Sequence, residues 1–185
     1  EQNMQKYGVS AFVYSGTAPT LLLSFHEIKF LEAEALSRLN RTSEAEAALK
    51  EAVSSAILNT ENSVASAITT LGSNITVTSQ ALTEEAANRY FEANVKPLFA
   101  IDPLKEVMLQ KYFAFWGASG EATESFNDVR RLKAEGKDFY AFKNTKKFPI
   151  RCPYGNSDTS ANPEVKAAYG DGQYIYSEQV WWAGG

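Results

Sequence analysis

Two stretches with helical spacing, separated by only three residues, constrain the fold more than any other part of the chain. Apolar residues recur at intervals of three and four over residues 24–39, and small apolar residues do the same over residues 43–58. A turn as short as residues 40–42 brings consecutive helices together in antiparallel orientation, and alanines along one ridge let the two backbones approach closely. The sequence therefore predicts a hairpin like those of tetratricopeptide (TPR) repeats.

Each of these two helices begins with a predicted capping box. Ser24 is followed three residues later by Glu27, and Ser43 by Glu46. In such a box the serine accepts a hydrogen bond from the third helical N–H, and the glutamate accepts one from the N–H of the serine. We expect helices to start at both serines.

The predicted interface of this hairpin uses the apolar stripe of each helix. On the first helix the stripe comprises Phe25, Ile28, Leu31, Ala35, Leu36 and Leu39, and on the second Ala45, Ala48, Leu49, Ala52, Val53, Ala56 and Ile57. The closest contacts are expected between Ile28, Leu31 and Ala35 on one side and Ala48, Ala52 and Ala56 on the other.

A second hairpin is predicted from residues 83–95 and 103–116. Thr83 is the expected N-cap of its first helix, and Pro97 is expected to end that helix. Asp102 followed by Pro103 is the expected start of its second helix. The helix starts near residues 24, 43, 83 and 102 give two equal steps of 19 residues. A further helix is predicted over residues 121–134, with Phe126, Val129 and Leu132 facing inward.

The remaining segments lack a helical period. Residues 1–23 are predicted to be an extended arm with a short strand at residues 11–14. Residues 59–80, rich in Ser, Thr and Asn, are predicted to be an insertion between the hairpins, with one or two further helical turns over residues 63–71 as the alternative. Residues 135–185 are predicted to form a long irregular tail that wraps the hairpins of residues 24–58 and 81–134. The expected fold class is all-α, with Trp181 and Trp182 docked because exposed tryptophans favour aggregation.

Composition excludes several classes of function. The chain has 185 residues, 44% hydrophobic residues and a net charge of −4, which does not suit a strongly basic nucleic-acid binder. No apolar run approaches the roughly 20 residues that a transmembrane helix needs. We therefore expect no nucleic-acid partner and no transmembrane segment.

Three stretches together resemble one known family. The first is residues 26–35, with Glu27, Phe30 and Ala33-Glu34-Ala35 at its centre; the second comprises Gln110-Lys111-Tyr112, Trp116, Glu121-Ala122, Phe126 and Asp128-Val129-Arg130-Arg131; the third comprises Pro149-Ile150-Arg151-Cys152-Pro153-Tyr154, Asn162-Pro163 and Val180-Trp181-Trp182. In this order they resemble the C-terminal part of the SusD/RagB family, the outer-membrane nutrient-binding lipoproteins of Bacteroidetes. The chain departs from the family's usual pattern at Ile150 and Ala183, where Arg and an acid are common.

The resemblance implies a function and a location. It implies non-enzymatic binding of a nutrient, typically an oligosaccharide, by a protein that sits on a TonB-dependent, SusC-like outer-membrane transporter and delivers the ligand to it. It also implies a lipid anchor at the cell surface, through an N-terminal part that this chain does not contain. The alternatives are an independent TPR-type module that binds a peptide and a glycan-active enzyme.

The residues themselves give little support to catalysis. His26 is the only histidine, and without a second histidine or a cysteine cluster we expect no metal site and no cofactor. Glu32 and Glu34 are two residues apart on a helix and so point to different faces. Cys152 is expected to be a plain structural thiol, and His26 a surface or half-buried residue.

Three groups remain as candidate sites. Asp128, Arg130 and Arg131, with Trp116 nearby, are expected to form a structural ion-pair network, in which the three-residue spacing pairs Asp128 with Arg131 and leaves Arg130 to reach the tail. The alternative is that these residues form a substrate-binding site.

Ligand-binding residues remain unknown, although sugars stack on exposed aromatic rings. The freer candidates are Tyr140, Tyr154, Tyr169, Tyr174 and Tyr176. The basic run from Lys133 to Arg151 is either a solvated loop or a docking surface for an acidic partner.

Overall fold

The computed structural model describes residues 20–70, 80–116, 121–142, 149–170, 172 and 176–181. Within these ranges the regular secondary structure is helical throughout and contains no β-strand. The chain divides into two compact units, residues 1–140 and 141–185, and each is described by itself. The predicted strand at residues 11–14 and residues 71–79 of the predicted insertion lie outside the described residues.

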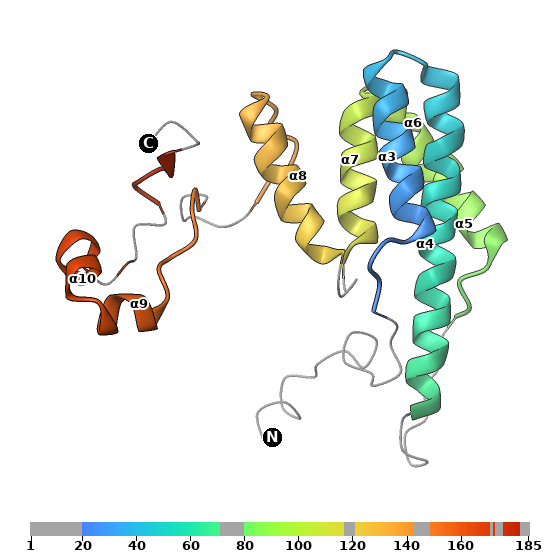
Figure 1. The fold of residues 1–185 in the computed structure, drawn as a ribbon. Helices are drawn as coiled ribbons and strands as arrows, with labels where there is room; N and C mark the ends of the chain where they lie inside the picture. Colours follow the sequence, from blue (N-terminus) through green and yellow to red (C-terminus); the bar gives the residue numbers. More distant parts are fainter. Residues whose placement is uncertain are drawn as a thin grey trace. The chain divides into compact units, whose positions relative to one another are not determined.

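The predicted first hairpin is present in unit 1. Helix α3 (Phe25–Arg38) and helix α4 (Thr42–Thr70) run side by side, joined by a short turn (Figure 1). Asn40 in this turn has a φ of 57°, in the left-handed region that asparagine tolerates better than most residues. Along α4, the alanine ridge is buried as expected, so the all-α, TPR-like fold class is confirmed.

Helix α4 is longer than the sequence suggested. It begins at Thr42, one residue before the expected cap Ser43, and continues through the Ser/Thr/Asn-rich residues to Thr70. The hydroxyls of Thr60 and Ser63 donate to the carbonyls of Ala56 and Asn59, each at 3.0 Å, so they are satisfied inside the helix. The boundary predicted near residue 58 is therefore not a helix end.

The predicted buried face of α3 is largely wrong, although Leu36 of that stripe packs, partly buried, against the core. Ile28 and Leu31 are 48% and 45% exposed, and Ala35 is exposed too, whereas Phe30 and Ala33 are fully buried. Helix α3 packs against both α4 and α7, and these contacts select the arc that carries Phe30 and Ala33. The helix has two apolar arcs, and periodicity alone chose the wrong one.

Only one of the two hydrogen bonds of the predicted capping box forms at the start of α3. The Ser24 hydroxyl accepts from the N–H of Glu27 at 3.1 Å, but the Ser24 N–H donates to the carboxylate of Glu121, which lies 97 residues away in sequence. Glu27 is consequently released from the capping box and is buried. At α4, Glu46 likewise pairs with Lys96 at 3.0 Å rather than closing a box with Ser43.

The second predicted hairpin contains an unexpected π-helical segment. Helix α5 (Glu84–Tyr90) continues directly into η1 (Phe91–Val95) and α6 (Lys96–Phe99), and α7 (Pro103–Ala114) follows. Thr83 and Asp102 cap α5 and α7 as predicted. Pro97 does not end the helix, because the wider π turn before it places the proline ring near the start of α6, where a missing N–H is tolerated.

The core of unit 1 lies between these helices. Its buried members come from α3, α4, η1, α6 and α7: Phe30, Ala33, Ala45, Ala48, Leu49, Ala52, Val53, Ala56, Phe91, Val95, Phe99 and Val107. Helix α8 (Ala122–Ala134) contacts α7 and buries Val129 and Leu132, whereas Phe126, expected inside, is 42% exposed.

The sequence predicted an irregular tail, but the tail contains regular helices. Unit 2 contains two short helices, α9 (Asn156–Ala161) and α10 (Pro163–Tyr169). The Asn162 side chain accepts from the N–H groups of Glu164 and Val165 at 3.0 and 3.3 Å, so asparagine and proline together start α10.

We expect the substitution Ala52→Leu to lower the free energy of unfolding by roughly 1–3 kcal/mol, because Ala52 is fully buried in a core without room for three more carbon atoms. Urea denaturation followed by circular dichroism measures the loss. Ala47→Leu, on the exposed face of the same helix, is the matched control and should change stability little. Equal losses in both variants would contradict the packing of α4 described above.

Candidate functional site

A buried lysine lies at the centre of the charged site in unit 1. Lys111 on α7 and Asp128 on α8 have side chains that are only 3% and 10% exposed, and their charged atoms lie 2.8 Å apart. The ammonium also lies 5.3 Å from the centre of the Phe115 ring. A buried ammonium is strongly unfavourable unless an acid accompanies it, so Asp128 neutralises a charge that α7 cannot hold alone.

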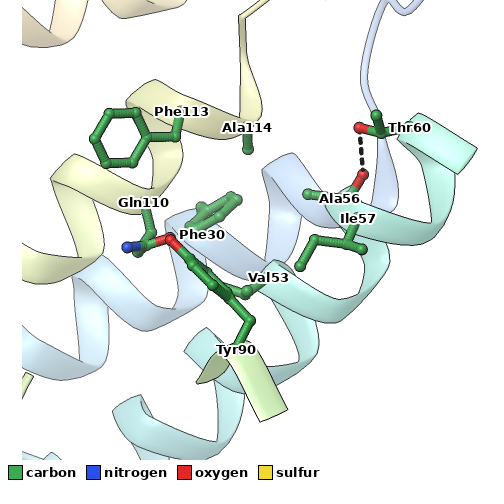
Figure 2. A pocket seen from close by; sticks show the side chains of 9 residues that line it. All are labelled: Phe30, Val53, Ala56, Ile57, Thr60, Tyr90, Gln110, Phe113 and Ala114. Carbon is green, nitrogen blue, oxygen red and sulfur yellow. Dashed lines mark hydrogen bonds between the residues drawn. The ribbon is translucent and has the colours of Figure 1, made fainter. Parts of the chain in front are cut away.

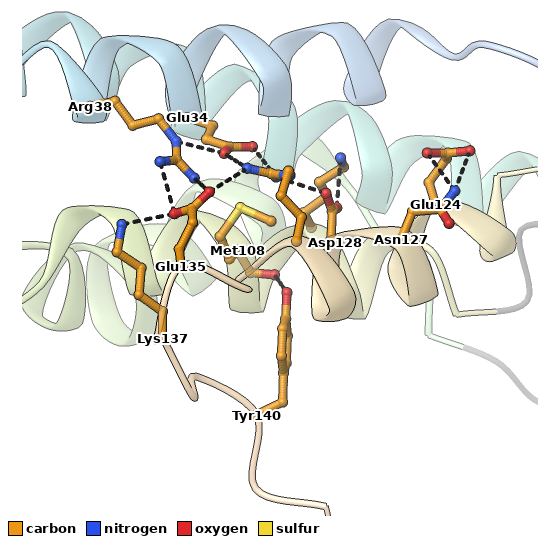
Figure 3. A network of polar contacts seen from close by, with 11 residues as sticks. Glu34, Arg38, Met108, Glu124, Asn127, Asp128, Glu135, Lys137 and Tyr140 are labelled. Atoms are coloured by element: carbon orange, nitrogen blue, oxygen red, sulfur yellow. Dashed lines mark hydrogen bonds and ion pairs between the residues drawn. The ribbon is translucent and has the colours of Figure 1, made fainter. Parts of the chain in front are cut away.

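Arg131 connects this pair to α3. It donates to Asp128 at 2.8 Å, as the three-residue spacing predicts, and its two terminal nitrogens contact the two carboxylate oxygens of Glu34 at 2.6 and 2.9 Å. The hydrogen bonds to Glu34 raise the pKa of Arg131 above its usual value, against the opposing effect of burial, and Asp128 adds to the rise. The network therefore joins three helices (Figure 3).

The network continues to a more exposed end. Arg38 on α3 donates to Glu34 at 2.8 Å and contacts both carboxylate oxygens of Glu135 at 3.0 Å. Lys137 contacts Glu135 at 3.1 Å. Arg38, followed by Lys137, lowers the pKa of Glu135 to about 2, so this carboxylate is ionised throughout the neutral range (Figure 3).

Other residues of the predicted motif do not join the network. Arg130, expected to reach the tail, places its guanidinium 5.7 Å from the ring centre of Phe126, one turn earlier on α8. Trp116 is exposed, contrary to the packing role its spacing suggested. Within unit 2 Trp181 is 80% exposed, and Trp182 lies outside the described residues, so the docking of the two tryptophans stays a prediction. Neither α9 nor α10 buries a side chain, so these helices provide no core for a tryptophan.

A second buried cluster was not predicted from the sequence. His26, expected at or near the surface, is buried together with Glu27 and Glu121. The Nε2 atom of His26 and the Oε2 atom of Glu121 lie 3.5 Å apart, and neither forms a hydrogen bond within the described part of the chain. Glu121 closes the gap between α3 and the start of α8, a contact that only the tertiary fold reveals.

Burial raises the pKa of Glu27 and lowers the pKa of His26. Burial, together with a hydrogen bond to Glu121 and its charge, raises the pKa of Glu27 to about 7, although Lys111 opposes the rise. Burial lowers the pKa of His26, an effect that Glu121 partly offsets. These groups are enclosed by helices, so a solute cannot reach them, and we assign them to the scaffold.

The described residues offer no metal centre. No three His, Cys, Asp or Glu side chains among them are arranged to hold a metal ion, and Cys152 is an exposed free thiol. In the same part of the chain, no helix combines the length and apolar character required to cross a membrane.

The tyrosines considered as sugar platforms have different environments. Tyr140 is buried, donates to the carbonyl of Met108 at 3.2 Å (Figure 3), and has a pKa raised by that burial. In unit 2 the rings of Tyr154 and Tyr169 lie 4.7 Å apart, with the Arg151 guanidinium 5.0 Å from the Tyr154 ring. Tyr176 is exposed, and Tyr174 lies outside the described residues.

The fold and the ion-pair network of Lys111, Asp128, Arg131 and Glu34 define a TPR-like helical scaffold, and a solved structure shares this fold. A crystal structure of a SusD/RagB family protein from Bacteroides thetaiotaomicron VPI-5482 matches 96% of this chain with 60% sequence identity and a TM-score of 0.80. The chain is therefore SusD/RagB-like over nearly its whole length. It spans 38% of the length of that protein. No family model and no curated protein matches the sequence.

We expect Asp128→Asn to lower the free energy of unfolding by about 3–5 kcal/mol, because it leaves the buried Lys111 ammonium without an acid. Arg130→Met on the same helix is the matched control and should cost below about 1 kcal/mol, the scale of an exposed cation–π contact. Urea melts of both variants measure the difference. Similar losses in the two would show that the Lys111–Asp128 pair does not hold α8.

The pKa of Glu27 gives a second prediction, for stability against pH. Since its pKa is about 7 in the folded chain and 4.5 in the reference state, the unfolded chain releases this proton first as pH rises. The contribution of Glu27 to stability is therefore complete below pH 4.5 and lost by about pH 7, on the order of 1–3 kcal/mol.

We expect Glu27→Gln to remove this loss, so that the variant gains stability relative to the parent between pH 5 and pH 8. Chemical denaturation at several pH values measures the effect. His26 contributes in the opposite direction, since its lowered pKa costs stability as pH falls, and it is the same in both proteins. The exposed Glu32→Gln on α3 is the control, and a parallel pH dependence of Glu27→Gln and the parent would refute the assignment.

Proposed function

We propose that this chain is part of a non-enzymatic protein that binds a nutrient at the bacterial outer membrane. The nutrient is an oligosaccharide, and the protein delivers it to a TonB-dependent, SusC-like transporter while held at the cell surface by a lipid anchor. The observation that carries the proposal is the 60% identity to a SusD/RagB family protein over 96% of this chain.

The chemistry of unit 1 supports a binding role rather than catalysis. The two carboxylates at the centre of the ion-pair network are engaged by cations: Glu34 by Arg38 and Arg131, Asp128 by Lys111 and Arg131. Hydrolysis of a glycoside requires two carboxyl groups that face the same open site, one to donate a proton and one to attack or activate water. A carboxylate held in a buried ion pair does neither.

Unit 2 provides the candidate surface for sugar. Tyr154, Tyr169 and Arg151 combine aromatic faces with guanidinium donors, which suits the apolar faces and hydroxyl groups of a pyranose ring. Tyr176 is exposed on the same unit. We include these residues in the proposal as the first to be tested.

We expect the protein to bind at least one member of a panel of neutral oligosaccharides and to leave it uncleaved. Isothermal titration measures binding, and chromatography of the recovered sugar tests for hydrolysis. Tyr154→Ala should weaken binding, whereas Tyr112→Ala on α7, outside this surface, is the control. Release of shortened sugars, lost when one carboxylate is replaced, would overturn the non-enzymatic proposal.

A hollow on unit 1 favours one second function, the binding of a peptide. Its lining comes from α3, α4 and α5 and is rich in side chains that hydrogen-bond: Lys50, Glu51, Ser54, Ser55, Asn59, Asn62, Glu84 and Asn88, with Phe25, Ala47 and Leu58. Affinity purification of the protein from detergent-solubilised outer membranes separates the two functions. Recovery of a transporter supports nutrient delivery. Recovery of a soluble protein, by a chain that binds no sugar, supports peptide binding.

A further inference from the structure

Unit 1 contains an apolar pocket that the proposed function does not use. It has a volume of about 240 Å³ and lies between α3, α4, α5 and α7 (Figure 2). Its lining consists of Phe30, Val53, Ala56, Ile57, Thr60, Tyr90, Gln110, Phe113 and Ala114. An apolar cavity of about 150 Å³ holds one benzene ring, so this pocket has room for a bicyclic ring.

Aromatic rings surround the pocket on several sides. The buried ring of Phe30 belongs to α3, Tyr90 ends α5, and Phe113 on α7 is largely exposed at the rim. Ile57 and Ala114 add aliphatic surface. Flat rings pack favourably against such walls, through edge-to-face or offset contacts.

The polar groups of the pocket form a chain with a fixed direction. The Tyr90 hydroxyl donates to Oε1 of Gln110 at 3.2 Å, and the Gln110 amide donates to the carboxylate of Glu106 at 2.8 Å (Figure 2 shows Tyr90 and Gln110). The Glu106 carboxylate at the end of this series of hydrogen bonds can only accept, so the NH₂ group of Gln110 must point toward it and the amide oxygen toward Tyr90. Donation along the chain makes the Tyr90 oxygen a better acceptor.

The Thr60 hydroxyl does not add a second polar contact of this kind. It donates to the carbonyl of Ala56 at 3.0 Å within α4. The pocket therefore presents apolar walls and one polar edge, at which Tyr90 accepts. A sugar, which carries hydroxyl groups around its whole ring, does not match this pattern.

From this arrangement we infer that the pocket binds a planar aromatic ring that carries one N–H or O–H donor, such as indole. The ring lies between Phe30, Tyr90 and Phe113, and its donor bonds to the Tyr90 oxygen. This site is distinct from the tyrosines of unit 2, and its failure would leave the oligosaccharide proposal intact.

Indole and benzofuran test the inference, because they have nearly the same shape and only indole has an N–H donor. Titrations followed by two-dimensional NMR of the whole chain measure both affinities. We expect indole to bind roughly threefold to tenfold more tightly than benzofuran, the value of one hydrogen bond. Tyr90→Phe should bring the two affinities together, and glucose should not compete.

Two filling variants test the location of the site. Ala114→Phe and, from the other wall, Thr60→Trp should each abolish indole binding, while Ala122→Phe on the exposed start of α8 should not. Circular dichroism identifies the variants that remain folded. Equal binding of indole and benzofuran by the parent, or undiminished indole binding by a folded filling variant, would overturn the inference.

One further ligand distinguishes a ring carried on a peptide from a free small molecule. Competition by N-acetyltryptophanamide would support the inference with a ring carried on a peptide. Binding of indole without such competition would support it with a free small molecule.

Discussion

The arrangement of α3, α7 and α8 depends on one buried charge, the ammonium of Lys111. The stem of this side chain packs within unit 1, where water does not reach its charged end. An unpaired ammonium in that position would be more costly than most single contacts in a domain can offset. Helix α8 supplies the acid, Asp128, and Arg131 on the same helix ties that acid to Glu34 on α3. Asp128 on α8 thus neutralises Lys111 on α7, while Glu34 on α3 is neutralised by Arg131 on α8 and by Arg38 on its own helix.

Local signals in the sequence predicted the helices well, but not the faces they bury. The caps at Ser24, Thr83 and Asp102 act within four residues, so sequence alone locates them. On α4 the alanine ridge is the only candidate for close packing, and it is buried. Helix α3 is different, because two apolar arcs compete and only contacts with α4 and α7 decide between them. The position of Pro97 was also not predictable from local rules, because the proline is tolerated in the helix only after a π turn.

The sites show the same division between local and distant contacts. The Asp128–Arg131 pair follows from spacing, but Arg131 finds its second partner, Glu34, 97 residues earlier in the chain. Glu121 is likewise 97 residues from Ser24, and its role as a cap replaces the Glu27 of the predicted box. Sequence reasoning named Glu121 only as part of a resemblance. For α10 the signal was local and available, since Asn162-Pro163 is an N-cap followed by a proline, yet the surrounding glycines and aromatics favoured an irregular tail.

This use of charge also limits where a ligand can bind. A carboxylate or guanidinium attracts a solute when the solute replaces water at that group, but at Asp128 the water has already been replaced by Lys111 and Arg131. A ligand would have to break those pairs and leave Lys111 uncompensated. The motif of Asp128 and Arg131 therefore serves the scaffold, and recognition falls to groups whose partners leave one side open. Tyr90 is such a group in the lining of the apolar pocket, because its hydroxyl donates to Gln110 and its oxygen can still accept a hydrogen bond.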